Sequence, residues 1–170
     1  GFNSAMSDYI LRDKATISSH AFEQRTGWLN GQDEALVALA QEDYTAKPDP
    51  IYEKQIRSAA ANLAARNGWA PEKQQLYADE KISEANVSVV NQYMDTSPAQ
   101  AAAFYQANKD KILPSMRAPL EKQIVEEGRY VAQQGYVEAL LVKYGDDEAA
   151  GLAEIRANYS GKDEDQVVAR

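Results

Sequence analysis

One pattern of helix starts, apolar positions and a shared tetrapeptide recurs along this chain and constrains its fold more than any other feature. The first copy covers residues 33–56 and the second covers residues 97–124, and both end on the sequence Glu-Lys-Gln-Ile. A third, looser copy covers residues 147–167 and opens on Asp-Glu-Ala, as the first does. Repeated helical pairs stack on their neighbours to bury a continuous core. The pattern therefore predicts an array of helical hairpins.

Apolar residues are spaced for helices nearly throughout the chain. The 170 residues include 28 alanines but only 9 glycines and 6 prolines, a balance that favours closely packed helices. Alternation of apolar and polar residues, which would indicate strands, does not persist beyond a few positions. We therefore predict an all-α fold, a multi-helix array of stacked hairpins similar to a degenerate α-solenoid or bundle.

Caps and breakers place the expected helix boundaries. Asn30-Gly31 is a typical helix stop, Pro50 and Pro98 suit first helical turns, and Ser97 is a good N-cap. A break near Gly128 or Gly135 is also compatible with the sequence. The expected helices cover about residues 7–30, 33–47, 50–66, 72–95, 98–108, 114–144, 147–158 and 163–170.

Domain organisation follows from the same signals. Residues 6–95 are predicted to form an N-terminal helical subdomain, and residues 96–170 a set of C-terminal hairpins. Residues 1–5 precede Met6 and are typical of a cloning remnant. The pattern stops in mid-helix at Arg170, which indicates truncation from a longer polypeptide.

Charge and composition exclude several classes of function. The net charge is −8, and each lysine and arginine lies within a few residues of an acid, so we expect no direct nucleic-acid binding and no attraction to anionic lipid. The absence of cysteine excludes disulfides and thiolate metal sites. No apolar run approaches the roughly 20 residues of a membrane span, so we expect a soluble chain without a transmembrane segment.

Catalytic and metal-binding patterns are weak. His20 is the one histidine, so we expect no metal and no cofactor. The acidic clusters at 146–148 and 163–165 lie where helix starts favour negative charge, and residues 126–127 form a third cluster. Lytic transglycosylases follow their catalytic glutamate with serine and a downstream Gly-Leu-Met-Gln stretch, whereas Ala85 follows Glu84 here and no such stretch exists. We therefore expect no catalytic residue in this chain.

Aromatic residues supply the candidate binding positions. Trp28 and Trp69 each follow a glycine near an expected helix boundary, and Tyr105 lies in the second hairpin copy. Aromatic side chains with a polar tip are enriched at protein interfaces, but at helical spacing they also complete cores. Trp28, Trp69 and Tyr105 are therefore candidates for an interface, with core packing as the alternative.

Residues 143–170 and 97–112 resemble a repeat found in large tailed-bacteriophage proteins, the internal virion proteins also called ejection or DNA-transfer proteins. The resemblance covers about residues 31–170. It implies a non-enzymatic structural role inside the virion, followed by delivery to the host envelope and help in forming a conduit for the genome. It also implies other virion proteins or further copies as partners, and it places any lytic transglycosylase module outside this segment.

Three other functions stay open, and each has a structural signature. A partner-binding α-solenoid would gather exposed aromatics on one concave face. A tail tape-measure or tail-assembly segment would show one very long uninterrupted helix. An enzyme would need a cleft holding Glu84 or another acid with a raised pKa.

Overall fold

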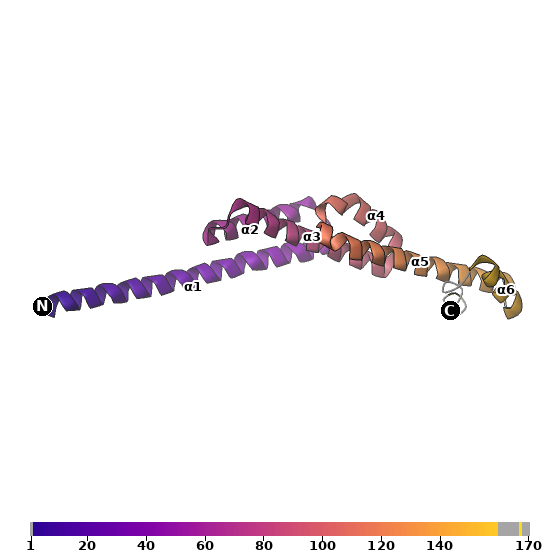
Figure 1. Ribbon diagram of the computed structural model, residues 1–170, viewed down its shortest axis with the longest axis horizontal. Helices are drawn as coiled ribbons and strands as arrows, with labels where there is room; N and C mark the ends of the chain where they lie inside the picture. Colours follow the sequence, from indigo (N-terminus) through magenta and orange to yellow (C-terminus); the bar gives the residue numbers. More distant parts are fainter. Residues whose placement is uncertain (1, 160–166, 168–170) are drawn as a thin grey trace. The chain divides into compact units, whose positions relative to one another are not determined.

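The computed structural model describes the backbone of residues 2–159 and 167, and the side chains of residues 12–159 and 167. This part of the chain contains α-helices and one short 3₁₀ helix, with no strand (Figure 1). The all-α prediction is confirmed, while the expected last helix, residues 163–170, lies outside the described residues apart from Val167. The elements are α1 Phe2–Ala46, α2 Pro50–Asn67, α3 Pro71–Thr96, α4 Pro98–Asn108, η1 Lys109–Lys111, α5 Pro114–Tyr144 and α6 Glu148–Asn158.

Side-chain caps begin several helices, and the sequence predicted the Ser97 cap and Pro50 in a first turn. The Asp49 carboxylate accepts a hydrogen bond from the Ile51 amide at 2.9 Å, and Pro50 occupies the first turn of α2. Ser97 caps α4 in the same way. Gly68 ends α2 with φ 61°, a left-handed conformation that glycine adopts without steric cost.

Helix α1 is continuous from Phe2 to Ala46, so the predicted stop at Asn30-Gly31 was wrong. Gly31 keeps a helical backbone and does not adopt the positive φ of a helix stop. The Asn30 side chain is instead bound to α2, accepting from Arg66 Nε at 3.0 Å and donating to Asn67 Oδ1 at 3.0 Å. Tertiary contacts thus override the local stop signal. Helix α5 likewise runs through Gly128 and Gly135 without a break.

The described residues form two compact units, and the division falls inside α3 between Val89 and Val90. The first unit contains α1, α2, the first part of α3 and Asp110–Leu113. The second contains the end of α3 together with α4, α5 and α6.

In the first unit, α2 lies alongside the C-terminal half of α1, and the N-terminal half of α1 continues beyond it (Figure 1). The Asp33 carboxylate is buried and forms an ion pair with Arg66 at the far end of α2. Tyr44 is buried near the other end, where its hydroxyl donates to Asn86 Oδ1 at 3.1 Å. The core between these ends contains Val37, Ala40, Ile56, Ala59 and Ile82.

In the second unit, α4 packs on α5 and α6 packs on the C-terminal end of α5. Tyr105 and Leu120 are buried between α4 and α5. Leu140, Ile155 and Val167 form a separate small cluster, covered by tyrosines such as Tyr136 and Tyr159. Each hairpin therefore has its own modest core.

Candidate functional site

Each of two hairpins contains a cluster of one tyrosine, one glutamate and one lysine. In the second unit, Glu121 Oε1 accepts from the Tyr105 hydroxyl at 2.5 Å and from Lys109 Nζ at 2.6 Å. At the end of the chain, Glu154 Oε2 accepts from the Tyr144 hydroxyl at 2.5 Å and from Lys143 Nζ at 2.6 Å. The glutamate ties together the two helices of its hairpin in both cases.

The shared tetrapeptide explains a third cluster in the first unit. Glu53 begins the first Glu-Lys-Gln-Ile copy as Glu121 begins the second, and its Oε1 accepts from Lys111 Nζ at 2.7 Å. Burial raises the pKa of Tyr44 to about 12, with a further contribution from the charge of Glu53 and a hydrogen bond to it. The recurring tetrapeptide therefore places a glutamate, Glu53 or Glu121, where it bonds to a lysine of another element in both copies.

The titratable groups of these clusters have pKa values shifted away from neutral pH, upward for Tyr105 and the lysines and downward for the glutamates. Burial is the main cause that raises the pKa of Tyr105, and its hydrogen bond to Glu121 adds to the effect. The hydrogen bonds from lysine and then tyrosine lower the pKa of both Glu121 and Glu154. A general acid or base is most effective when its pKa lies near the working pH. The clusters are thus suited to holding helices together.

Glu84, the acid that an enzyme would require, is also engaged in structural bonds. Its carboxylate accepts from Lys81 Nζ at 2.9 Å and from Gln41 Nε2 at 3.0 Å. Burial alone would raise its pKa, but the hydrogen bonds from Lys81 and Gln41 outweigh that effect and the pKa of Glu84 is lowered. A catalytic acid needs the opposite shift.

The remaining polar candidates have simple structural partners. His20 lies exposed on α1 and its Nε2 is 3.2 Å from Gln24 Nε2. Asp147 caps α6, accepting from the Ala150 amide at 3.2 Å. Across the described part of the chain, no group of three or more histidine or acidic side chains could hold a metal ion. The cluster at 163–165 lies outside that part.

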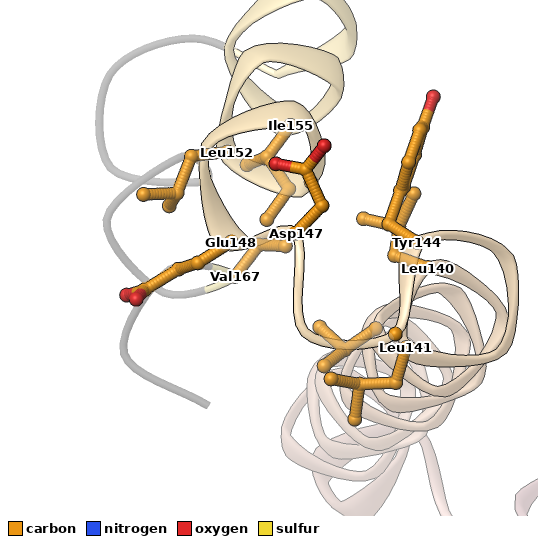
Figure 2. A pocket seen from close by; sticks show the side chains of 11 residues that line it. Leu140, Leu141, Tyr144, Asp147, Glu148, Leu152, Ile155 and Val167 are labelled. Atoms are coloured by element: carbon orange, nitrogen blue, oxygen red, sulfur yellow. The ribbon is translucent and has the colours of Figure 1, made fainter.

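A small apolar hollow lies between α5 and α6 (Figure 2). Leu140 and Leu141 line it from α5, and Leu152 and Ile155 line it from α6. Its volume is about 170 Å³. This is similar to a cavity of roughly 150 Å³ known to hold benzene, so the hollow could accept one apolar side chain or a very small apolar molecule.

The three aromatic candidates occupy different environments. Trp28 is 63% exposed on α1. Trp69 is half-buried after α2, with its ring 5.4 Å from that of Tyr77 and Lys73 Nζ 4.4 Å above it. Tyr105 belongs to the other unit and is only 1% exposed, which leaves its ring no free surface. The interface remains a prediction, and Trp28 is the residue best placed to carry it.

The exposed part of α1 is more extensive than sequence reasoning suggested. None of the side chains from residue 12 to residue 32 is buried. Ile17 and Phe22, whose spacing with Leu29 is compatible with one face of a helix, are 68% and 71% exposed. The signal that could have found this surface is a second apolar stripe, formed by Ile17, Trp28 and Leu39 on the side away from α2.

Comparisons with known proteins do not show a family. No family model matches the chain, and no solved structure matches it. The chain is 26% identical over 127 residues to Fidgetin-like protein 1 from Xenopus tropicalis, a match that covers 73% of this chain. It spans only 19% of that protein's length. Within the described residues, no helix is long and apolar enough to cross a membrane.

Proposed function

We propose that this chain is a non-enzymatic assembly segment of a bacteriophage internal virion protein, packaged in the particle and delivered to the host envelope during genome transfer. Its role is to join other subunits through helical surfaces, and so to help build the conduit for the genome. The phage origin rests on the sequence resemblance of residues 31–170. The assembly role has independent support from α1.

The single observation that carries the assembly role is the uncovered length of α1. Residues 12–32 have no buried side chain, yet they include Ile17, Phe22 and Trp28, each more than 60% exposed. Most helical stability in proteins comes from packing of one helix face against other elements. Large exposed apolar side chains on such a helix are typical of a surface that another protein covers.

The polar clusters support the same proposal. The Tyr–Glu–Lys groups of the hairpins and the bonds of Glu84 are those of a rigid scaffold, in which carboxylates with lowered pKa tie helices together. The negative net charge disfavours binding to DNA, so a conduit built from this chain would let the genome slide past.

A tail tape-measure or tail-assembly segment is the second candidate, because α1 is a single uninterrupted helix of 45 residues. Helices of globular proteins average about 11–12 residues. A long helix that spans a fixed distance is what a length-setting protein requires. The two candidates differ in where the chain resides within the particle.

Peptide mass spectrometry on purified particles of the encoding phage tests the proposal, with heads and tails also analysed separately. We expect peptides of this chain in intact particles, their loss after triggered genome release, and their absence from isolated tails assembled without heads. The major capsid protein, retained throughout, is the internal control.

Other outcomes would overturn the first choice. Peptides found in tails assembled without heads would favour the tape-measure function. Peptides retained after release would identify a fixed structural part of the particle. Complete absence from particles would favour a partner-binding α-solenoid that acts elsewhere.

A further inference from the structure

A narrow stripe of exposed residues follows one side of α1 for about eight turns. At 100° per residue, its members fall within roughly 80° of the helix circumference. The face that packs on α2, which includes Val37 and Tyr44, lies on nearly the opposite side. We name this surface the Trp28 stripe. It includes Lys14, Ile17, Ala21, Trp28, Ala35, Leu39 and Glu42, all exposed, and the exposed Gln24 and Gln32 lie within the same arc, four residues before and after Trp28.

The Trp28 stripe is symmetric in sequence about Trp28. Alanines lie seven residues before and after it, at positions 21 and 35. Large aliphatic residues lie eleven residues before and after it, Ile17 and Leu39. Opposite charges lie fourteen residues before and after it, Lys14 and Glu42. A surface with this symmetry is complementary to a second copy of itself running in the opposite direction.

From this we propose that α1 pairs with α1 of a second copy of the chain in an antiparallel, two-fold symmetric arrangement centred on Trp28. An isologous interface uses the same patch on both subunits, so that residue i meets residue j and j meets i. Here Ile17 faces Leu39 of the second copy, and Lys14 faces its Glu42. The two Trp28 rings meet at the symmetry axis, and Ala21 of each copy faces Ala35 of the other further along the pair.

Charge decides between the two directions of pairing. A parallel pair would place Lys14 beside Lys14 and Glu42 beside Glu42, which sets like charges together at both ends. The antiparallel pair places opposite charges together at both ends. More broadly, the segment 12–25 carries three basic and two acidic residues, whereas the segment 33–43 carries four acidic residues and no basic one. Like charges across an interface suppress the wrong arrangement.

The length of the stripe suits a two-stranded pairing. From Lys14 to Glu42 the helix rises about 42 Å at 1.5 Å per residue. Residues 14, 21, 28, 35 and 42 repeat every seven positions, and because a straight α-helix drifts only about 20° per heptad they stay on one side of α1 along this whole length. Such a partner would cover Ile17 and Trp28, which the chain itself leaves exposed.

This inference deepens the proposed function, because it rests on α1 being an assembly surface and names a second copy as its partner. It does not need the phage origin. Failure of the mass-spectrometry test would leave the pairing intact, and failure of the pairing would leave the packaged segment without its proposed mode of self-assembly.

Sedimentation equilibrium of the full chain tests the pairing. We expect a mass of twice 18.8 kDa that falls toward 18.8 kDa on dilution. Trp28→Glu places two carboxylates at the symmetry axis and is expected to leave a monomer at every concentration, with a circular dichroism spectrum that stays predominantly helical. Val142→Glu, at a side chain 89% exposed on α5, is the matched control and is expected to sediment like the wild type. A monomeric wild type, or a Trp28→Glu variant that still dimerises, would overturn the proposal.

Disulfide trapping tests the direction, because the chain has no cysteine of its own. Mixing Ile17→Cys with Leu39→Cys should yield a cross-linked heterodimer, whereas Ile17→Cys alone should not cross-link. Efficient cross-linking of Ile17→Cys alone would indicate parallel pairing and overturn the proposal.

Charge reversal gives an independent test. Lys14→Glu should weaken association about fivefold, the scale of two exposed ion pairs replaced by like charges. Lys14→Glu combined with Glu42→Lys should restore the wild-type dissociation constant. A double variant no tighter than the single one would contradict the antiparallel pairing.

Discussion

Replacement of Gly31 by alanine tests whether α1 is one continuous helix through the position where the sequence predicted a stop. Gly31 is exposed, its backbone is helical, and an added Cβ would meet no atom within 4 Å. Alanine in an exposed helix interior is more favourable than glycine by about 0.8 kcal/mol. Gly31→Ala should therefore stabilise the first unit by that amount.

Gly68 provides a matched control in the same unit, because its replacement by alanine should change stability in the opposite direction. It also has open space around its Cβ position, but its φ of 61° is unfavourable for alanine. The left-handed conformation costs a residue with a side chain about 1 kcal/mol. Gly68→Ala should therefore destabilise the unit by about 1 kcal/mol, although both glycines have equally empty surroundings.

Urea unfolding followed by circular dichroism at 222 nm measures both variants, at one fixed protein concentration because association changes apparent stability. For a slope of about 1.5 kcal/mol per molar urea, the midpoint of Gly31→Ala should rise by about 0.5 M, and that of Gly68→Ala should fall by about 0.7 M. If Gly31 ended a helix in a left-handed conformation, its alanine variant would be destabilised like Gly68→Ala. That result would refute the continuous α1.

The remaining predictions concern contacts within the first unit. Arg66→Ala removes the partner of the buried Asp33 carboxylate and should lower the free energy of unfolding by about 3 kcal/mol. Arg57→Ala breaks an exposed ion pair with Asp79 and should lower it by less than about 1 kcal/mol. Equal losses of stability for the two variants in urea unfolding would contradict this. Leu63→Ala should cost about 3 kcal/mol and Leu76→Ala under about 0.5 kcal/mol, since the first side chain is 2% exposed and the second 55%. The pKa of Tyr44, raised to about 12, means that the unfolded state loses this proton first as pH rises above 10. The contribution of Tyr44 to the free energy of unfolding should thus be present below pH 10 and lost by pH 12. In an absorbance titration at 295 nm, Tyr44→Phe should remove the tyrosine signal that titrates at the highest pH. If that signal persists, the raised pKa belongs to another tyrosine.

Local signals predicted much of the fold because helix ends depend on a few neighbouring residues. The Ser97 cap and Pro50 in a first turn were predicted from the sequence, and the Asp49 cap and the left-handed Gly68 depend on equally local contacts. These features rely on backbone groups within one turn, so no distant contact is needed to predict them.

The continuity of α1 could not be predicted from the same local rules. Asn30-Gly31 has the sequence of a helix stop, but Asn30 bonds to residues of α2 that lie 36 and 37 positions later. The ion pair of Asp33 and Arg66 depends on the same long-range packing. Continuing a helix through a glycine costs about 1 kcal/mol relative to a good helix former. Several tertiary hydrogen bonds together contribute more stability than that.

The candidate site was predicted only in part. Aromatic composition pointed to Trp28, which is exposed, and to Tyr105, which is buried and whose hydroxyl donates to Glu121 across the hairpin. The sequence contains the recurring tyrosine and the recurring tetrapeptide, but their contact depends on how each hairpin closes. The symmetric Trp28 stripe is visible in the sequence only once α1 is known to be a single helix.

Hydrogen exchange along α1 tests the central claim, that residues 12–32 form an assembly surface, most directly. The amides of residues 56–64 in α2, a helix that contains no residue of the Trp28 stripe, serve as the internal reference. We predict that protection of residues 12–32 rises with protein concentration while protection of residues 56–64 stays constant, and that Trp28→Glu abolishes the rise. Residues 12–32 that stay equally unprotected at every concentration, or equally protected down to the most dilute sample, would contradict the claim.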